Sequence, residues 1–468
     1  MPFFHDLPLV YISYMKKIIS IILVLAYYTG FSQGIPGNFI VVKPQAGDDW
    51  NYLQTAINSC ISKGIKDIYF SKGTYEISKP LLLENDGEFF SLNLIGEDAA
   101  HFNLETSEAR IVCTFRDGFA IGYQKARSSL IKGLVIYGVG RGRDERFNVY
   151  SAISIDPYNR KKNGTSGSSG ITIKNCRIRN FTAGIIISQN GVTLNAENIH
   201  VEDCSIDGVK VAYATCQRQS KANTVRNLIC WENVETVFDG VSYGQGQGNI
   251  PYIDGANIAG KVYQIFNFGA QQFSTSAQKI FAETIVRIGN IVDGGIGVTI
   301  RDSYFDFDWY RFPSSHFKGD NITFDNVGMR YYDDKNDKRI IIDGLNNTFL
   351  NGYADKPFLM KVAEKEELHR TNYYFNYKCV AGSKLRVVAQ SELETFYWLD
   401  QQYIDVKTKT ITVTDRPIKG KVGDYIDLGH PFSPIARIVG IQGNVIKIDN
   451  IVDGFQSKKT HIGINGLK

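Results

Sequence analysis

The chain has 468 residues, of which 43% are hydrophobic and 21% charged, as in a soluble protein long enough for a sizeable core. Its formal net charge of +4 is too small to indicate a nucleic-acid-binding protein. Glycine (44 residues) and aromatic residues (12%) are frequent while methionine (4) is scarce, which favours β structure with many turns.

The N-terminal segment has the pattern of a secretory signal. A basic start at Met15–Lys17 precedes a short apolar run with a polar exit near Gln33. The run is shorter than a membrane-spanning helix requires, so we expect no stable membrane insertion. We predict that residues 1–33 are a signal peptide, with Met15 as an alternative start of translation. We also predict that the protein is secreted, periplasmic or at the cell surface.

Five segments share one pattern: two apolar residues two positions apart, then Asn or Asp at the fifth position. They are "ITIKNCRI" (171–178), "IHVEDCSI" (199–206), "ICWENVET" (229–236), "VTIRDSYF" (298–305) and "ITFDNVGM" (322–329). Their fifth positions hold Asn175, Asp203, Asn233, Asp302 and Asn326. Where copies are adjacent they begin about 24–30 residues apart, a period typical of solenoids. Asn and Asp tolerate the left-handed backbone of a sharp bend, so each copy predicts two short strands joined by a corner.

A third strand follows most copies. These strands are "AISID" (152–156), "GIIIS" (184–188), "GVKVAY" (208–213) and "GVSYG" (240–244). Three strands per coil predict a three-sided parallel β-solenoid, in which coils bury apolar residues against their neighbours and crossovers are right-handed. Cys176 and Cys204 occupy one position in adjacent copies, beside small or apolar residues, and we predict a reduced, buried stack there.

The segment before the repeat also has a defined pattern. In "GDDWNYLQTAINSCISKGIKDIYFSKGTYEISKPLLL", Leu53, Ile57 and Cys60 have helical spacing, and a strand at Ile68–Phe70 and a turn at Gly73–Tyr75 follow. Together with the repeat, this segment resembles the pectate-lyase-like superfamily of right-handed parallel β-helix proteins, in which a helix caps the open end. That superfamily includes polysaccharide lyases, glycoside hydrolases, epimerases and virus tailspikes, so the resemblance implies a fold without selecting an activity.

The predicted fold class is therefore all-β. Residues 34–380 are expected to form a right-handed parallel β-helix of three sheets with an N-terminal capping helix. After about residue 380 the repeat ends, and short strands with Gly-Asn or Gly-Asp turns predict a small β-barrel or sandwich at residues 381–468. We expect this C-terminal part chiefly to cap the solenoid, with glycan binding as an alternative.

The resemblance places the substrate groove along the third strand and its loops. If Val209 and Val211 point inward, Lys210 points outward as the only cation of its column. The neighbouring loop is basic, with Arg218, Lys221 and Arg226 as candidate contacts to substrate. Such a groove suits an anionic polysaccharide, because these side chains pair with carboxylate or sulfate groups. The alternative is that the loop is simply a solvated surface.

β-Elimination from a uronic acid needs a group that neutralises the carboxylate, a base and an acid. We predict Lys210 or Arg218 as base or neutraliser. Tyr213 and Tyr243 are the candidate acids. A calcium ion held by Asp156 and Asp239 is an alternative neutraliser, and no other cofactor is expected.

Hydrolysis needs two carboxyl groups on either side of the scissile bond. In "DSYFDFDWY" (302–310), one face of an extended strand carries Ser303, Phe305 and Phe307. The opposite face carries four polar candidates: Tyr304, Asp306, Asp308 and Tyr310. The α-carbons of the two aspartates would lie about 6.5–7 Å apart, which suits an inverting pair, and the tyrosines could contact sugar. The alternative is a surface role alone.

The chain lacks a His-Glu-x-x-His motif, a Gly-rich phosphate loop and a Cys-x-x-Cys pair, as well as the Asn-Thr-Asp and Gly-His-Gly signatures of polygalacturonase-type hydrolases. The first hypothesis is a secreted enzyme that cleaves an acidic polysaccharide by β-elimination. The alternatives are a glycoside hydrolase on the same scaffold and a non-catalytic glycan-binding or tailspike-like protein. A polysaccharide is the expected partner, and the oligomeric state is left open.

Overall fold

The computed structural model describes most of the chain beyond residue 38. The described residues are 39–96, 109–158, 167–191, 196–271, 274–293, 297–308, 313, 315–331, 340–344, 346–356, 358–362, 372–375, 377–379, 386–389, 394–399, 404–405, 407–412, 421–423, 425–427, 436–449 and 460–465. The predicted signal peptide at residues 1–33 and the sugar-contact candidate Tyr310 lie outside them.

One helix caps the first coil, as predicted. Helix α2 (Trp50–Lys63) buries Leu53, Ile57 and Cys60, and ends at Gly64 in the left-handed conformation. It lies against β2 (Asp67–Phe70) and β4 (Leu81–Leu83). The side-chain amide of Gln54 donates to the Leu82 carbonyl (2.8 Å) and accepts from the Leu82 N–H (2.9 Å). The helix therefore satisfies the backbone groups of an edge strand that would otherwise be open to other chains.

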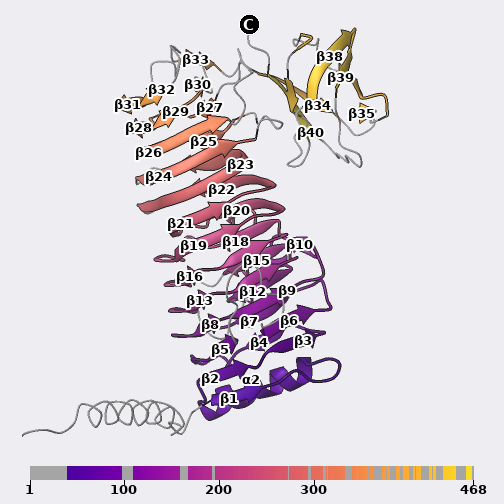
Figure 1. The fold of residues 1–468 in the computed structure, drawn as a ribbon, viewed down its shortest axis with the longest axis vertical. Coiled ribbons are helices and arrows are strands. Elements are labelled where there is room, and N and C mark those ends of the chain that lie inside the picture. The colour runs from indigo at the N-terminus through magenta and orange to yellow at the C-terminus, as the bar shows by residue number, and fades with distance from the viewer. Residues whose placement is uncertain are drawn as a thin grey trace, which may run out of the picture. The chain divides into compact units, whose positions relative to one another are not determined.

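Parallel pairing joins strands β1 (Phe39–Val42) to β33 into one continuous 31-stranded ladder that coils upward from α2 (Figure 1). Two strands in this range, β10 (Asp144–Glu145) and β11 (Asn148–Val149), pair only with each other as a hairpin. The first sheet contains β2, β5 (Asn93–Gly96), β8 (Leu130–Lys132), β13 (Thr172–Lys174), β16 (His200–Glu202), β28 (Thr348–Leu350) and β31 (Tyr373–Phe375). The second contains β3 (Gly73–Ile77), β6 (Ala109–Cys113), β9 (Leu134–Tyr137), β14 (Arg177–Arg179), β17 (Ser205–Asp207), β29 (Tyr353–Ala354) and β32 (Lys378–Cys379).

The third sheet completes each coil. It contains β4, β7 (Phe119–Tyr123), β12 (Ser151–Ile155), β15 (Ala183–Ile187), β18 (Val211–Thr215), β20 (Val234–Asp239), β22 (Val262–Ala270), β25 (Phe317–Gly319), β27 (Ile340–Asp343), β30 (Phe358–Val362) and β33 (Arg386–Ala389). Several longer strands turn a corner between sheets without a break: β19 (Thr224–Cys230), β21 (Tyr252–Ile258), β23 (Thr275–Asp293), β24 (Val298–Phe307) and β26 (Ile322–Tyr331). The predicted fold class, a parallel β-helix with a helical cap, is confirmed.

A ladder of left-handed residues forms the corner between the first and second sheets. Its members, in register along the solenoid, are Asn175, Asp203, Asn227, Gly255, Lys279, Asp302, Asn326 and Asn351. Each has φ between 48° and 96°. Side-chain amides also link neighbouring coils, since Asn326 donates to Asp302 over 2.8 Å.

This ladder corrects one step of the predicted repeat. Asn233 does not stack on Asp203; the residue in register with Asp203 is Asn227, whose amide donates to the Asp203 carboxylate over 2.9 Å. Asn233 instead lies at the next corner, because Glu232 beside it accepts the N–H of Gly208. The members Gly255 and Lys279 also fill the long gap that the sequence pattern left between copies.

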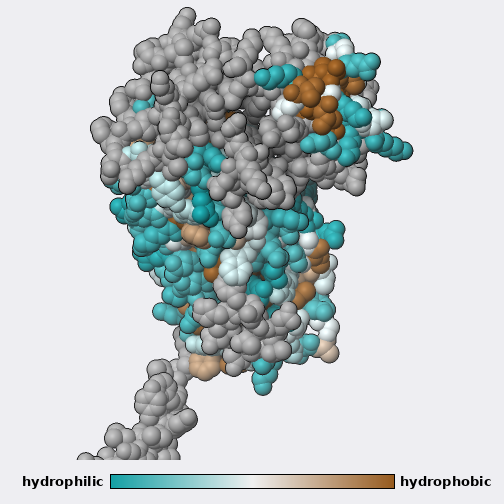
Figure 2. Space-filling model, turned by 45° about the horizontal axis from the view of Figure 1, so that its top comes forward, coloured by the Kyte–Doolittle hydropathy of each residue, from teal (hydrophilic) through white to brown (hydrophobic). Residues whose placement is uncertain are grey.

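The interior of the solenoid is filled by aliphatic and aromatic side chains. Phe238 and Phe266 stack on adjacent coils with ring centroids 5.9 Å apart. Cys176 and Cys204 are buried and reduced in neighbouring coils, as predicted. In Figure 2 most of the described outer surface of the solenoid is hydrophilic.

The C-terminal part forms a separate antiparallel sheet. Its seven described strands are ordered β34 (Glu394–Leu399), β40 (Thr460–Asn465), β37 (Tyr425–Asp427), β38 (Ala436–Gln442), β39 (Val445–Ile448), β36 (Thr410–Thr412) and β35 (Ile404–Asp405). The parallel pairing of the solenoid thus continues to Ala389, past the expected boundary at residue 380. Within the described part of the chain, no helix is long and apolar enough to span a membrane.

Candidate functional site

The outer face of the third sheet, where the groove was expected, is covered. A hairpin of β10 (Asp144–Glu145) and β11 (Asn148–Val149) and the loop at residues 240–249 are joined by a hydrogen bond from the Gly244 N–H to the Arg146 carbonyl (2.9 Å). An apolar cluster is buried there, consisting of Val149, Ala183, Ile186, Val211, Ala214, Cys216 and Tyr243. The middle of this sheet therefore presents no open trough to a polymer.

Lys210 and Tyr243 are brought together by a residue that the sequence reasoning missed. Lys210 lies just before β18 and forms an ion pair with one carboxylate oxygen of Asp144. The Tyr243 hydroxyl donates to the other oxygen over 3.0 Å. Burial and the Asp144 charge raise the pKa of Tyr243, so this phenol, a candidate acid, gives up its proton less readily than an ordinary tyrosine. The arrangement ties the hairpin to the sheet.

Tyr213 does not lie on the outer face of the third sheet, where its predicted role would require it. It was a candidate acid, but its ring lies in the solenoid core, fully buried, and packs edge-on against Phe238 with centroids 6.3 Å apart. Val211, expected inside, belongs to the outer cluster. The reason is that Ala212 and Tyr213 both contribute to the core, so the simple alternation of side chains fails in this strand.

The two carboxylates proposed to hold calcium are buried and lie far apart. Asp156 accepts hydrogen bonds from the Lys125 N–H and from both the N–H and the hydroxyl of Ser168, at 2.7–3.0 Å. Asp239 accepts from the backbone and hydroxyl of its own turn and from Asn267. The strands β12 and β20 that precede them are three coils apart, about 14 Å at the usual strand spacing. One ion therefore cannot bridge them, and among the described residues no group of three His, Cys, Asp or Glu could hold a metal.

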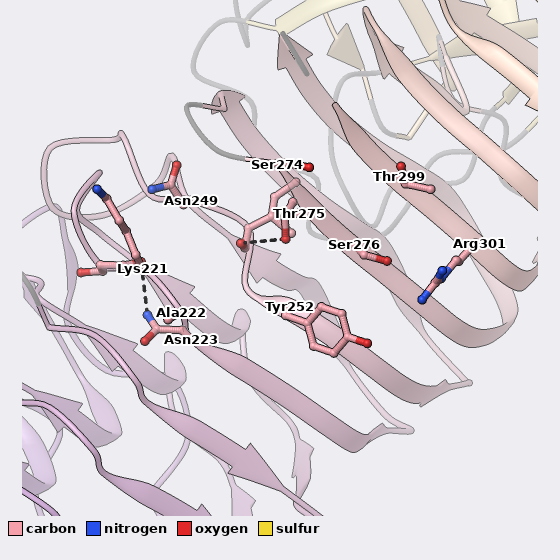
Figure 3. Close-up of a pocket in the computed structure, with 12 residues that line it drawn as sticks. Lys221, Ala222, Asn223, Asn249, Tyr252, Ser274, Thr275, Ser276, Thr299 and Arg301 are labelled. Atoms are coloured by element: carbon pink, nitrogen blue, oxygen red, sulfur yellow. Dashed lines mark hydrogen bonds between the residues drawn. The ribbon is translucent and has the colours of Figure 1, made fainter. Parts of the chain in front are cut away.

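A pocket of about 430 Å³ opens instead on the outer face of the first sheet (Figure 3). Its floor is a row of three side chains in register on β21, β23 and β24: Tyr252, Ser276 and Thr299. Arg301 extends the floor along β24. The wall comes from the segments at the beginnings of β19, β21 and β23, at residues 220–223, 249–250 and 274–275.

The lining of this pocket combines polar and apolar surface and is positively charged. Lys221 and Arg301 lie on its wall and floor, and no carboxylate is among the described residues that line it. The Arg301 Nε donates to the Gln278 side-chain oxygen over 2.6 Å. The Gln278 amide in turn donates to the Tyr252 hydroxyl over 3.1 Å. Gln278 thus holds both the guanidinium and the phenol at fixed positions on the floor.

Three polar atoms of the pocket-lining residues are buried without a hydrogen-bond partner. They are the hydroxyls of Ser220 and Ser276 and the side-chain oxygen of Asn249. A buried polar atom left unpaired costs about 1–3 kcal/mol. Three of them around one cavity indicate a place where a ligand or water supplies the missing bonds after a small rotation of the side chain.

The predicted basic loop forms part of this pocket. Lys221 lines it directly. The Arg218 backbone carbonyl accepts a hydrogen bond from the amide of Asn249, another lining residue. Arg226 is exposed on the adjacent strand β19, and its guanidinium lies 3.8 Å from the Glu202 carboxylate. The sequence therefore identified one wall of the pocket. Arg301 was missed although its segment (298–305) was recognised as a copy, because the groove was expected on the third sheet, and Tyr252 was missed because its strand was not placed in the repeat.

A second polar surface lies around the corner, on the outer face of the second sheet. As predicted, Phe305 and Phe307 are buried in the core and Tyr304 and Asp306 face outward. Asp306 is ion-paired with Arg330 of the next coil, at 3.1 Å. Asp308 follows the end of β24, and its backbone N–H donates to the Ile285 carbonyl over 2.7 Å. Asp306 therefore forms an ion pair with the neighbouring coil, instead of facing the substrate together with Asp308 as an unpaired carboxylate.

One more carboxyl group, missed from the sequence, lies two coils along from Asp306. Asp355 accepts the backbone N–H of Tyr331 with both oxygens, each at 3.1 Å. Burial raises the pKa of Asp355 to about 6, so it can be protonated near neutral pH. Burial also raises the pKa of Asp306, although Arg330 opposes this. No sequence pattern marks Asp355, because it follows a short strand outside the five recognised copies.

No protein-family model matches the chain, and no curated protein matches it either. Among solved structures, the A-module of a mannuronan C-5 epimerase from Azotobacter vinelandii is 10% identical with a TM-score of 0.44, covering 73% of this chain and 97% of that one. The N-terminal fragment of bacteriophage Phi29 gene product 12 is 11% identical with a TM-score of 0.47, covering 81% and 68%.

The catalytic domain of a GH87 α-1,3-glucanase in complex with nigerose is 12% identical with a TM-score of 0.42, covering 76% of this chain and 69% of that one. At such identities the likeness concerns the solenoid fold and not the activity. The described fold is the β-helix that the resemblance to the pectate-lyase-like superfamily implies.

Proposed function

We propose that this protein acts on an acidic polysaccharide, which it binds in the pocket on the first sheet and cleaves by β-elimination. The observation that carries the proposal is the lining of that pocket, where Lys221 and Arg301 lie at opposite ends without a carboxylate among the described lining residues (Figure 3). A volume of about 430 Å³ lies within the range of small-molecule sites, and a cationic lining selects an anionic sugar unit.

The three roles of β-elimination can be assigned to lining residues. Arg301, oriented by Gln278, pairs with the uronate carboxylate and stabilises the charge that develops there. The Tyr252 oxygen, which Gln278 holds near Arg301, removes the proton beside the carboxylate, the C–O bond to the leaving sugar breaks, and a C=C bond forms. The same Tyr252 hydroxyl then passes this proton to the leaving oxygen. Lys221, at the other end of the pocket, pairs with a further acidic unit of the polymer.

A matched set of variants tests this proposal. The purified protein is incubated with uronate-containing and neutral polysaccharides while unsaturated ends, by ultraviolet absorbance, and reducing ends are followed together. Arg301→Ala should lower kcat/KM by about 10- to 100-fold, since hydrogen bonds to charged groups contribute about 1.5–3 kcal/mol. Lys174→Ala, which removes another cation from the outer face of the first sheet, should leave the rate unchanged.

Two results would contradict the assignment. If Lys210→Ala abolished cleavage while Arg301→Ala did not, the site would lie on the third sheet instead. If the protein bound acidic glycans but released neither kind of end, it would be a glycan-binding protein without catalysis.

Hydrolysis is the second candidate, and the carboxyl groups on the second sheet favour it. Asp306 and Asp355 are separated by two coils, about 9.6 Å between α-carbons at the usual strand spacing. Inverting hydrolases hold their carboxyl groups about 6.5–9.5 Å apart. With its pKa of about 6, Asp355 would be the acid. Reducing ends without unsaturated ends, lost in Asp355→Asn, would support this second function.

A further inference from the structure

Three aromatic side chains form a row on the outer face of the second sheet. Phe281, Tyr304 and Tyr353, here called the aromatic row, lie in register on β23, β24 and β29, with Gly328 of β26 between the two tyrosines. The rings of Phe281 and Tyr304 stack with centroids 5.3 Å apart and planes 15° from parallel. Phe281 and Tyr353 are 45% and 40% exposed. Single exposed aromatics are common, whereas three in register on one face form a larger apolar surface.

Gly328 allows the rings of Tyr304 and Tyr353 to approach each other across the coil that lies between them. A Cβ atom at this position would come within 2.8 Å of the Tyr353 ring and 3.1 Å of the Tyr304 ring. Both tyrosines therefore lie over the glycine backbone and occupy the space that a side chain would take. The aromatic row is consequently continuous along the solenoid rather than three separate rings.

A charged row runs beside the aromatic row, two residues further along each strand. Its members are Glu283, Asp306, Arg330 and Asp355. The two rows are about 7 Å apart at the usual strand rise. Arg330 links them, because its guanidinium lies 5.2 Å from the Tyr304 ring centroid and 3.1 Å from the Asp306 carboxylate. The other Asp306 oxygen is buried and has no hydrogen-bond partner.

These two rows match the two sides of a sugar ring. A pyranose has an apolar face of C–H groups, which packs on the electron-rich face of an aromatic ring, and a rim of hydroxyls, which hydrogen-bond to carboxylate and guanidinium groups. A protein partner would need a larger apolar area than three rings provide. A row that carries three carboxyl groups and one cation disfavours a uronate, so the occupant is a neutral sugar.

We propose that the aromatic row is a binding platform for neutral sugar rings, with the charged row holding their hydroxyls. This inference rests on the proposed action on a polysaccharide and deepens it. Arg301 in the cationic pocket and Tyr304 in the aromatic row are on the same strand, on either side of the corner residue Asp302. A polymer that engages both surfaces therefore contains acidic and neutral sugars.

Calorimetric titration with neutral oligosaccharides of glucose, mannose and xylose tests the platform. The double variant Phe281→Ala and Tyr353→Ala should weaken binding by about 2- to 10-fold for each ring removed. Gly328→Ala should also weaken binding, because its methyl group displaces both tyrosine rings while every aromatic residue is kept. The control Tyr69→Ala removes a ring of similar exposure, 39%, from a distant coil and should change nothing.

The outcomes separate this inference from the proposed function. Arg301→Ala should abolish binding of a uronate monosaccharide and leave neutral oligosaccharides bound, whereas the double variant should weaken binding of the neutral oligosaccharides and leave the uronate bound. If the unmodified protein binds none of the neutral oligosaccharides, or if Tyr69→Ala weakens binding as much as the double variant does, the platform does not exist. Loss of uronate binding alone would count only against the pocket.

Discussion

The outer face of the third sheet and the outer faces of the first two sheets carry different residues and are covered differently. On the third sheet, Ser154, Ile186 and Ala214 point outward in one column, and all are buried. On the first and second sheets, the corresponding columns hold charged and aromatic side chains that reach solvent, such as Arg301 and Phe281. In this β-helix the first and second sheets therefore keep outward side chains open to solvent, and it is there that we propose the binding surfaces.

The largest expected effect comes from the interior of the third sheet. Tyr213→Ala should lower the free energy of unfolding by about 3–5 kcal/mol, because a buried aromatic ring is lost from a packed core. Urea denaturation followed by circular dichroism measures this. Tyr69→Ala, at an exposed site, should stay within about 0.5 kcal/mol of the unmodified protein. Equal losses of stability in the two variants would indicate that Tyr213 lies on the surface, and would again favour the third sheet as the substrate site.

A smaller loss of stability is expected at Asp239, which holds the loop at residues 240–249 over the third sheet. Asp239→Ala should cost about 2–4 kcal/mol, because the carboxylate accepts hydrogen bonds from two backbone N–H groups, the Ser242 hydroxyl and the Asn267 amide. Hydrogen exchange of the loop at residues 240–249 should accelerate with it. Asp254→Ala, which removes a partly exposed ion pair with Lys279 and a hydrogen bond from Gln278, should cost less, about 1 kcal/mol. A rise in the unfolding midpoint on adding calcium would instead support a metal role for Asp239.

The smallest effect concerns the open second sheet and depends on pH. Asp355 has a pKa of about 6 in the folded protein, above its ordinary value of 3.8, so its protonated form stabilises the fold and this contribution is lost as pH rises through 6. Asp355→Asn has no such loss. Between pH 4.5 and 7.5 the stability of the variant relative to the unmodified protein should therefore rise by about 1–2 kcal/mol. A difference that is flat with pH would show that Asp355 is not perturbed.

The sequence predicted the corners of the solenoid better than its surfaces. Asn175, Asp203, Asp302 and Asn326 all have the expected left-handed backbone, because few other residue types tolerate it. Asn233 was aligned one corner too far, since the copy that has Asn227 at its fifth position begins with the polar Asn223 instead of an apolar residue. Lys279 gave no signal at all, because lysine rarely adopts this conformation.

The site could be predicted only in part, for a physical reason. Which residues face outward follows from strand parity, and this worked for Tyr304 and Asp306. It failed at Tyr213, where two consecutive residues face the core. Contacts between coils, such as Asp306 with Arg330 or Lys210 with Asp144, join residues 24 and 66 positions apart. Such pairs depend on the exact register of coils and on long loops, and neither is encoded in a local pattern.

The corner at Asp302 has a further consequence for ligands. Arg301 and Tyr304 flank it within one strand, and Asn326 of the next coil fixes the Asp302 side chain through a 2.8 Å hydrogen bond. The distance between the Arg301 guanidinium and the Tyr304 ring is thus set by two short stretches of one strand and by a corner that a hydrogen bond holds in place. A polymer that contacts both proposed sites would therefore need its acidic and neutral units at one fixed spacing. Chains in which these units are spaced differently would fit only one of the two proposed sites.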